Sequence, residues 1–383
     1  MDYILLEKAY MAQTYKRQNV VIVQGKGASA IDDKGKTYID FTSGIGVNSL
    51  GYAPSQILNA IVKQFNKVQH TSNIYYNEPS IELAKHLCEA TNYKKVFLAN
   101  SGAEANECAF KLVRKYHSDK NDGKTKILSL KNSFHGRTMA TLTLTGQEIF
   151  HKDFNPFMQE VEYIDEDVDF STFKNIGGIF IELVQGEGGV VPINKDFLAR
   201  LVKFAKENDV LIVDDEVQTG IGRTGKLLCL EHFNIKPDIV TLAKGLGGGM
   251  PIGACLIGKK AEDTFNYSSH GSTFGGNPIS SSAAKVVLGE INKASFLSAI
   301  VEKGQYLKEN IEAIKGVKAV TGLGLMIGIQ LETKKAQEVV AGCIEKGLLV
   351  LTAKEKIRLL PPLNIDKKEI DAGLSILKEV IEN

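Results

Sequence analysis

The chain alternates short, strongly apolar runs with longer segments in which apolar residues recur every three or four positions. The short runs predict strands at residues 95–99, 127–130, 177–181, 210–213, 239–242 and 254–257. The helical spacing predicts helices over residues 54–67, 80–90, 101–117 and 196–208. The four apolar residues at 210–213 are typical of a parallel strand that is buried on both faces. We therefore expect an α/β fold with a mostly parallel central sheet.

Both ends of the chain mix short strands with helices. After a loosely amphipathic start at residues 1–18, strands are predicted at 20–23, 28–32 and 37–41. Toward the C-terminus, a long helix starts over residues 280–293, and another is expected at 335–346. Strands are predicted there at residues 317–320, 325–330, 348–351 and 356–360. A last helix follows Asp366, where Glu369 completes a capping-box pattern.

Two of the predicted strands end in charged residues that favour one cofactor. Strand 210–213 runs into Asp214, Asp215 and Glu216, and Lys244 follows strand 239–242 after one alanine. A lone lysine at a strand end is most often simply solvated. Partial desolvation, however, lowers a lysine pKa, and the neutral amine can form a Schiff base with a carbonyl. Pyridoxal phosphate requires a lysine for that bond and a carboxylate against its pyridine nitrogen, and both lie where α/β sheets bind ligands.

A small-residue turn, Ser101-Gly102-Ala103, connects strand 95–99 to the following helix. Free N–H groups and the positive end of the helix dipole make such a turn an anion site, although Ser101 could also be an ordinary N-cap. Phe134 and Arg137 lie in the loop after strand 127–130. The ring could stack on a planar cofactor and the guanidinium could bind a carboxylate; a structural ion pair is the alternative for Arg137.

Composition excludes several classes of protein. A net charge of +1 over 383 residues argues against a nucleic-acid surface. The sequence contains no run of 18 apolar residues, so no transmembrane helix is expected. The N-terminus shows no signal-peptide pattern. Five scattered cysteines without C-x-x-C fit reduced thiols in the cytoplasm, and neither they nor the seven dispersed histidines show metal-ligand spacing. The length suggests two or three domains.

The motifs Asp215-Glu-Val-Gln-Thr-Gly-Ile-Gly-Arg-Thr-Gly225 and Leu242-Ala-Lys244-Gly-Leu resemble those of the class III, fold-type I pyridoxal-phosphate aminotransferases. Within that family the chain is most similar to the acetylornithine aminotransferases, from Thr14 to Leu363. The resemblance implies a large cofactor-binding domain, residues 46–284, and a small α+β domain built from residues 1–45 and 285–383. It also implies a homodimer with shared active sites.

The resemblance assigns roles residue by residue. Lys244 would carry the cofactor, Asp215 would pair with its pyridine nitrogen, and Gln218 would hydrogen-bond its ring oxygen. The cofactor phosphate would be bound by Ser101, Gly102 and Ala103, and from the partner subunit by Ser272 and Thr273, while Phe134 stacks on the ring. Tyr15 and Ser272 would contact the substrate, and Arg137 would bind its α-carboxylate. Arg358 would bind the distal carboxylate of 2-oxoglutarate or glutamate. Glu187 would face an arginine that binds substrate.

The implied reaction moves the terminal amino group of N-acetylornithine to 2-oxoglutarate. Ile45 and Gly46 stand where ornithine δ-aminotransferases carry an aromatic residue, which favours an acylated substrate. Leu183 and Tyr52 depart from the proline and histidine that are usual in the family. Ornithine, 4-aminobutyrate, succinylornithine or lysine-pathway substrates remain alternatives, as do an aminomutase and a non-enzymatic cofactor-binding protein.

One glycine-rich segment imitates two other motifs. Gly220-Ile-Gly222-Arg-Thr-Gly225-Lys226 matches the dinucleotide fingerprint and most of a P-loop. Leu227 stands where a P-loop needs a hydroxyl for Mg²⁺, and six residues separate the segment from its strand. We therefore expect neither nucleotide chemistry nor a metal site.

Overall fold

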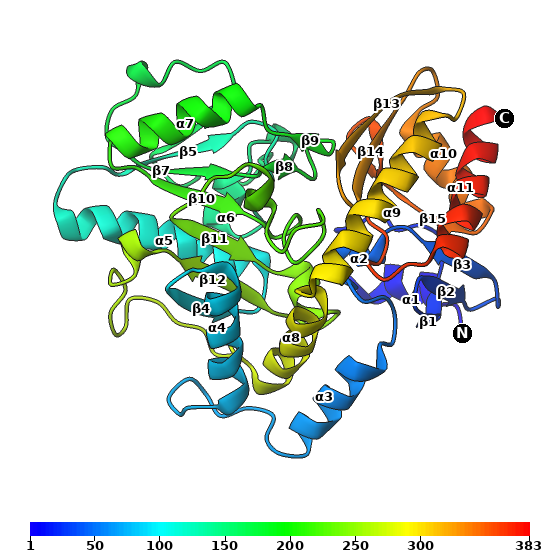
Figure 1. Ribbon diagram of the computed structural model, residues 1–383, viewed down its shortest axis with the longest axis horizontal. Helices are drawn as coiled ribbons and strands as arrows, with labels where there is room; N and C mark the ends of the chain where they lie inside the picture. Colours follow the sequence, from blue (N-terminus) through cyan, green and yellow to red (C-terminus); the bar gives the residue numbers. More distant parts are fainter.

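The computed structural model describes residues 1–383, and its largest sheet has seven strands in the order β4-β12-β11-β10-β7-β5-β6 (Figure 1). These strands are β4 (Lys95–Ala99), β5 (Lys126–Leu130), β6 (Val161–Ile164), β7 (Ile176–Ile181), β10 (Leu211–Asp215), β11 (Ile239–Leu242) and β12 (Gly253–Ile257). Only β12 is antiparallel to its two neighbours, β4 and β11, and the other pairs are parallel. The predicted α/β class with a mostly parallel sheet is confirmed.

Helices cover both faces of this sheet. They are α4 (Glu78–Thr91), α5 (Gly102–Lys120), α6 (Met139–Leu144), α7 (Lys195–Glu207) and α8 (Pro278–Ile291), and α3 (Ser55–Phe65) packs on α8. Successive strand residues face opposite sides, so Ile127 packs in one core cluster with Leu112 of α5, and Leu128 packs in another with Leu201 of α7. The carboxyl ends of the parallel strands therefore stay at one edge of a rigid three-layer body.

The two ends of the chain combine in smaller sheets beside the large one (Figure 1). The first has the order β1-β2-β3-β15 and consists of β1 (Ile22–Lys26), β2 (Ser29–Asp32), β3 (Thr37–Asp40) and β15 (Leu348–Leu349). The second has the order β13-β14-β17-β16 and consists of β13 (Val317–Leu323), β14 (Met326–Leu331), β16 (Leu351–Ala353) and β17 (Lys356–Leu359). Helices α9 (Ala294–Glu312), α10 (Ala336–Glu345) and α11 (Lys367–Glu382) pack on them. The capping box of Asp366 and Glu369 is confirmed at the start of α11.

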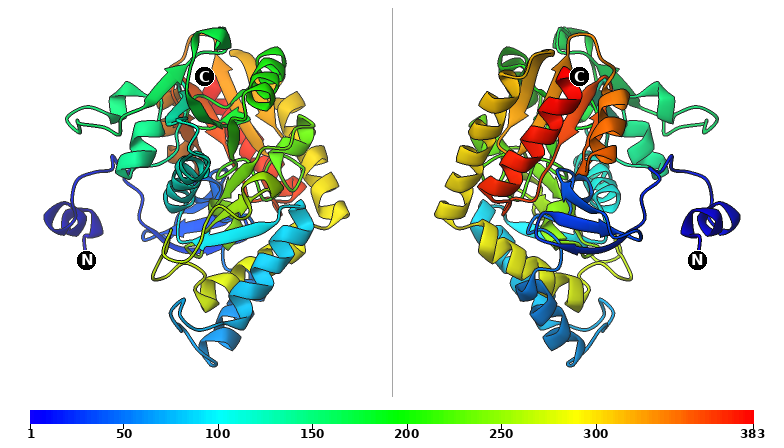
Figure 2. Two further views of the ribbon diagram at one scale, coloured as in Figure 1. Left: turned by 90° about the vertical axis from the view of Figure 1, so that its left-hand side faces the viewer. Right: turned by 90° about the vertical axis from the view of Figure 1, so that its right-hand side faces the viewer.

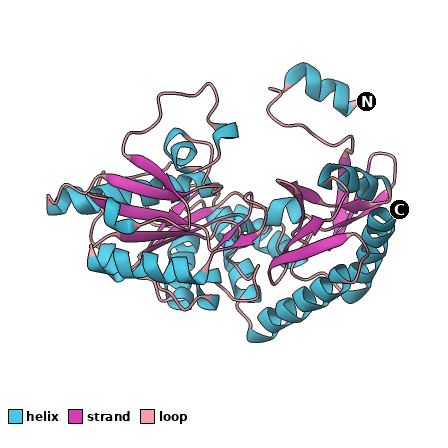
Figure 3. Ribbon diagram, turned by 90° about the horizontal axis from the view of Figure 1, so that it is seen from above, coloured by secondary structure: helices cyan, strands magenta, loops and turns pink.

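Short elements complete the chain. They are α1 (Tyr3–Tyr10), α2 (Ser43–Gly46), the paired strands β8 (Val184–Gln185) and β9 (Val191–Pro192), and the 3₁₀ turns η1 (Glu148–Phe150), η2 (Phe170–Thr172), η3 (Cys229–His232), η4 (Lys244–Gly247) and η5 (Lys259–Ala261). Helix α1 stands away from the body and buries none of its residues (Figures 2 and 3). None of the helices combines the length and the apolar composition that crossing a bilayer requires.

Three predicted elements differ from the structure. The first strand is Ile22–Lys26 rather than 20–23, because its pairing with β2 fixes the register. The long helix from 280 is divided into α8 and α9 because Asn292 ends α8 and Lys293 is extended. The strand at 348–351 is divided at Val350, since β15 pairs with β3 and β16 with β17. The predicted domain boundary at 284/285 falls inside α8, and the division stays a prediction.

Candidate active site

The strand ends of the large sheet surround a cleft of about 490 Å³. Residues following β4, β5, β7, β10 and β11 line it, together with Met250, Pro251 and Ile252, which precede the antiparallel β12. Nine of the predicted site residues line this cleft: Ser101, Gly102, Ala103, Phe134, Arg137, Glu187, Asp215, Gln218 and Lys244. The sheet topology therefore brings together groups that lie more than 100 positions apart in the sequence.

Lys244 lies just beyond β11 in a left-handed backbone conformation, with a φ of 39°. Its side chain is half-buried, and no carboxylate lies within 4.0 Å of its amine. Burial lowers the pKa of Lys244, the charge of Arg358 acts in the same direction, and the charge of Glu187 partly opposes both. A lowered pKa increases the neutral fraction of the amine, which is the form that attacks a carbonyl or accepts a proton.

Asp215, at the end of β10, is fixed by three hydrogen bonds. Its Oδ2 atom is 2.7 Å from Nδ1 of His135 and accepts a 2.7 Å bond from Nδ2 of Asn106. Its Oδ1 atom accepts a 3.0 Å bond from the backbone N–H of Val217. Burial by itself lowers the pKa of His135, but the contact with Asp215 outweighs it and raises the pKa. Thr241 in turn orients Asn106 by donating to its Oδ1 at 2.7 Å.

The predicted anion site lies at the N-terminus of α5. Ser101 is the N-cap, and its Oγ accepts a 3.1 Å bond from the backbone N–H of Glu104. A Cβ atom at Gly102 would lie 2.7 Å from Cγ1 of Val217, so only glycine fits this approach. The first backbone N–H groups of a helix lack intrahelical partners, and here they border the cleft beside Asp215. The N-cap alternative is therefore compatible with an anion site.

The loop after β5 places Phe134 and Arg137 at the mouth of the cleft. The guanidinium carbon of Arg137 lies 5.5 Å from the ring centroid of Phe134 and 4.0 Å from that of Phe150. Arg137 is exposed and makes no ion pair with an aspartate or glutamate. The structural ion pair that was the alternative for Arg137 is therefore not formed. A guanidinium supported by two aromatic rings remains available for an incoming carboxylate.

Arg358, on β17, contacts two residues that line the cleft. Only 3% of its side chain is exposed, and Nη1 donates to Oε1 of Glu187 and, at 3.2 Å, to Oε1 of Gln218. Burial raises the pKa of Glu187, but Arg358 outweighs this effect and holds the pKa below its ordinary value. Glu187 therefore stays ionised and covers one arginine, whereas Arg137 is left uncovered.

Four predicted residues lie outside the lining of the cleft, and one of them is Arg358, which contacts the lining residues Glu187 and Gln218. Tyr15 is 72% exposed in the segment after α1, with the guanidinium carbon of Arg17 5.2 Å from its ring centroid. Ser272 accepts a 3.1 Å bond from Nδ2 of Asn100, which places it beside the anion site of its own chain. Thr273 is exposed next to it. The predicted roles of these residues stay predictions.

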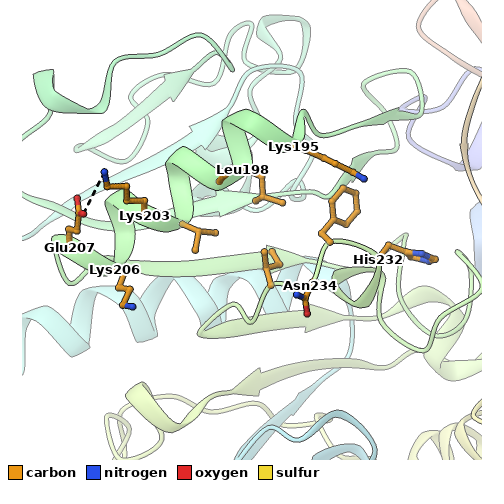
Figure 4. A pocket seen from close by; sticks show the side chains of 11 residues that line it. Lys195, Leu198, Lys203, Lys206, Glu207, His232 and Asn234 are labelled. Atoms are coloured by element: carbon orange, nitrogen blue, oxygen red, sulfur yellow. Dashed lines mark ion pairs between the residues drawn. The ribbon is translucent and has the colours of Figure 1, made fainter.

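A wider hollow of about 750 Å³ lies between α7 and the residues after η3 (Figure 4). Its rim carries Lys195, Lys203, Lys206 and His232, and its floor is apolar. It contains none of the predicted site residues, and Lys203 already pairs with Glu207 at 3.9 Å. The smaller cleft, with its converging charged groups, is therefore the candidate active site.

Comparison with known proteins agrees with this assignment. The model of the family described as aminotransferase class-III matches residues 10–381. The chain belongs to the class III aminotransferase family. The acetylornithine aminotransferase of Haemophilus ducreyi is 46% identical to this aminotransferase over 98% of this chain and 97% of the relative.

Solved structures share the fold of the aminotransferase. The ornithine aminotransferase from Toxoplasma gondii superposes with a TM-score of 0.94 at 28% identity, covering 100% of this chain and 94% of that one. The N-acetylornithine aminotransferase from Stenotrophomonas maltophilia gives a TM-score of 0.86 at 34% identity, covering 99% and 98%. The expected fold-type I architecture, with a large sheet domain and a smaller domain from both termini, is confirmed.

The aminotransferase site also contains residues to which the sequence assigned no role. Glu182, directly after β7, accepts from the backbone N–H of Phe134 at 3.0 Å and of Gly186 at 3.3 Å, and burial raises its pKa to about 7. His135 and Asn106 fix Asp215, as described above. An acid that directly follows a buried strand is a signal that could have indicated Glu182. His135 gave no comparable signal because its partner lies 80 positions away.

The two departures from the family pattern lie outside the lining of the cleft. Leu183 is fully buried in the core cluster under α7, where an apolar side chain contributes to packing. Tyr52 packs beside Gly25, whose Cβ position lies 2.5 Å from Cγ of the tyrosine ring. Neither residue lines the cleft of the aminotransferase.

Proposed function

We propose that this aminotransferase uses pyridoxal phosphate to move the terminal amino group of N-acetyl-L-ornithine to 2-oxoglutarate. The products are N-acetyl-L-glutamate 5-semialdehyde and L-glutamate, as in arginine biosynthesis. The observation that carries the proposal is the unequal state of two arginines. Arg137 has no carboxylate partner, whereas Arg358 is covered by Glu187.

The cleft fits the proposed cofactor by the chemistry of its groups. The N-terminus of α5 offers N–H donors for a phosphate, and Gly102 leaves room that a side chain would fill. Asp215 offers a carboxylate for a protonated ring nitrogen, Phe134 an aromatic face, and Lys244 a partly desolvated amine. When bound, pyridoxal phosphate supplies an electron sink for the carbon that carries the amino group.

Each residue then has a defined task. Lys244 would accept at Nζ the proton of the substrate carbon that carries the amino group, which its lowered pKa favours, and would hold that proton for its return on the other side of the carbon–nitrogen bond. Asp215, held by His135 and Asn106, would keep its charge directed at the ring nitrogen. The aromatic rings under Arg137 and the apolar residues before β12 would limit the water around these charges.

The two arginines account for one site that accepts two unlike substrates. N-acetylornithine has one carboxylate, which Arg137 would bind while Glu187 keeps Arg358 neutralised. 2-Oxoglutarate has two carboxylates, and its distal one would replace Glu187 as the partner of Arg358. With the ion pair formed, only Arg137 is available to a carboxylate. With the ion pair open, both Arg137 and Arg358 are available.

Turnover assays with competing amino donors test this proposal. Glutamate production from 2-oxoglutarate would be measured with N-acetylornithine, ornithine, N-succinylornithine and 4-aminobutyrate. We expect the highest kcat/KM with N-acetylornithine, because relatives that are 45%, 46% and 47% identical are named acetylornithine aminotransferase. A higher value with another donor would correct the substrate, and amino transfer without 2-oxoglutarate would instead indicate an aminomutase. No reaction with any donor would leave a non-enzymatic role.

We also propose that two copies of the chain form a cytoplasmic homodimer. Ile74, Tyr75 and Tyr76 are exposed by 84%, 72% and 95%, and Phe274 by 60%. The two segments adjoin, because Asn73 donates to the backbone oxygen of Ser272 at 2.8 Å. Exposed apolar surface beside a site favours a protein interface, and free, mostly buried cysteines fit a reducing compartment. The molar mass in solution, measured by light scattering, checks the dimer.

A further inference from the structure

Arg223 is a buried arginine that the proposed chemistry does not use. It lies in the glycine-rich segment after β10, where the sequence imitates nucleotide-binding motifs, and only 2% of its surface is exposed. No carboxylate pairs with it, and burial lowers the pKa of Arg223 to about 9, partly opposed by the charge of Asp40. A buried charge without an ionic partner is costly, so its hydrogen bonds indicate what it does.

These hydrogen bonds join three segments that are remote in sequence. Nη1 of Arg223 donates to the backbone oxygens of Leu325 at 3.0 Å and Pro361 at 2.6 Å. Nη2 donates to Oγ of Ser43 at 3.4 Å. In the opposite direction, the backbone N–H of Leu325 donates to the backbone oxygen of Arg223 at 3.0 Å. The guanidinium is thus the common donor to helix α2, to the turn between β13 and β14, and to the loop after β17.

Two of the three segments lead directly to the substrate side of the cleft. Ser43 begins α2, and Val47, which follows that helix, lines the cleft. Pro361 follows Arg358 by three positions on the same chain segment. The two segments also contact each other, because Oγ of Ser43 donates to the backbone oxygen of Leu360 at 2.7 Å. Arg223 therefore closes a ring of contacts that fixes Arg358 relative to the residues around Val47.

The segment at Ser43 needs such support because its backbone is strained. Ser43 and Ile45 have φ angles of 42° and 63°, a left-handed region that L-residues with side chains rarely adopt. Strained conformations persist where the surroundings determine them. The Cβ position of Gly46 lies 4.0 Å from Nε and Nη2 of Arg223, so the guanidinium also limits how far this segment can move inward.

We propose that Arg223 is a positioning residue that sets the distance between Arg358 and the α2 segment, and so determines the affinity for the distal end of the substrate. It does so without touching substrate or cofactor. The inference rests on the proposed function, because it uses Arg358 as the site of the distal carboxylate. Arg223 should therefore affect a dicarboxylate more than a monocarboxylate of the same length.

The test compares Arg223→Lys and Arg223→Met with the wild-type holoenzyme. Glutarate and pentanoate serve as unreactive probes with two carboxylates and one, and their dissociation constants are measured by calorimetry. We expect Arg223→Met to weaken glutarate binding about tenfold, since it removes several hydrogen bonds from a charged donor. Pentanoate binding should stay unchanged, KM for 2-oxoglutarate should rise by the same factor, and kcat should stay near wild type. Lysine keeps the charge but not the fork of donors, so Arg223→Lys should be intermediate.

Arg200→Lys is the matched control. Arg200 also donates to backbone oxygens, including that of Val168 at 2.7 Å, but it lies on α7 away from the cleft. The Arg200→Lys variant should bind glutarate and pentanoate with the same dissociation constants as the wild type. If glutarate binding does not change in Arg223→Met, or if pentanoate binding, kcat and cofactor affinity fall together with it, Arg223 is only structural and the inference is wrong.

Ser43→Ala keeps the inference testable should the arginine variants fail to fold. It removes one acceptor of the guanidinium and the bond to Leu360, so glutarate binding should weaken in the same direction by a smaller factor. Unchanged glutarate binding would overturn the inference. A wild-type enzyme that binds no glutarate and forms no glutamate would instead overturn the proposed function, and the inference with it.

Discussion

At the scale of single residues, the site depends on charges held by partners that are themselves buried. Asp215 and His135 are 4% and 0% exposed in their ion pair. Removing one member of a buried pair leaves the other uncompensated, which typically costs about 3–5 kcal/mol. We expect Asp215→Ala to lose stability of this order and most of its turnover, measured by chemical denaturation and by kcat. Asp122→Ala, which breaks the His117–Asp122 pair away from the cleft, should lose stability but keep turnover. Near wild-type turnover in Asp215→Ala would show that Asp215 is not the carboxylate that pairs with the ring nitrogen of the cofactor.

The same pair predicts a dependence on pH. The pKa of His135 is raised by Asp215 in the folded protein. Its stabilising contribution is therefore complete below the pKa of an unfolded histidine, about 6.5, and is lost as pH rises through the raised folded pKa. The difference in Tm between wild type and His135→Gln should shrink from about pH 5 to about pH 9. A difference that stays constant over this range would contradict the assignment.

Glu187 and Arg358 make a prediction about substrate preference. In Glu187→Gln the guanidinium loses its ionic partner but keeps a polar neighbour. The distal carboxylate of 2-oxoglutarate then displaces nothing charged, so its KM should fall. The KM for N-acetylornithine should rise, because Arg358 is left uncompensated beside an uncharged acyl group. Steady-state kinetics of both half-reactions checks this, and parallel changes in the two KM values would exclude a gating role.

At the scale of elements, the N-terminus of α5 is where backbone packing limits the site most closely. Gly102→Ala would place a methyl group 2.7 Å from Val217, whereas Gly289→Ala in α8 would meet nothing within 4 Å. We expect Gly102→Ala to weaken cofactor binding and to lose about 1–3 kcal/mol through overpacking. Gly289→Ala should gain up to about 1 kcal/mol from its better helix propensity. Cofactor titration and thermal unfolding measure both, and equal effects would contradict the packing argument.

Elements also show which parts of the site the sequence could predict. Lys244 and Asp215 could be predicted because Asp215 ends β10 and Lys244 comes just after β11, and parallel strands end at one edge of a sheet. The contact between Arg358 and Glu187 could not be predicted from local pattern, since it joins residues 171 positions apart through the packing of separate sheets. The break between α8 and α9 escaped prediction because apolar periodicity continues through Asn292. Local pattern therefore predicts elements and strand ends, and tertiary packing decides the rest.

At the scale of the whole molecule, the proposed dimer makes its active sites interdependent. Lys244 and Thr273 of one site would belong to different chains. Mixing the two variants Lys244→Ala and Thr273→Ala should therefore produce dimers in which one site carries both changes and the other carries none. Activity should return when the two variants are unfolded, mixed and refolded together. Each variant unfolded and refolded alone is the control. Failure to recover activity, with mixed dimers demonstrated by mass, would mean that each chain builds its own site.

One strand pair also constrains how the protein is made. β3, near the start of the chain, is completed only by Leu348 and Leu349 of β15. The ribosome must therefore synthesise about nine-tenths of the polypeptide before the edge of this early sheet finds its neighbour. Until then, an open strand edge is available to other nascent chains. Premature termination between the end of β12 and the start of β15 would release a polypeptide prone to aggregation, even though its large sheet is already complete.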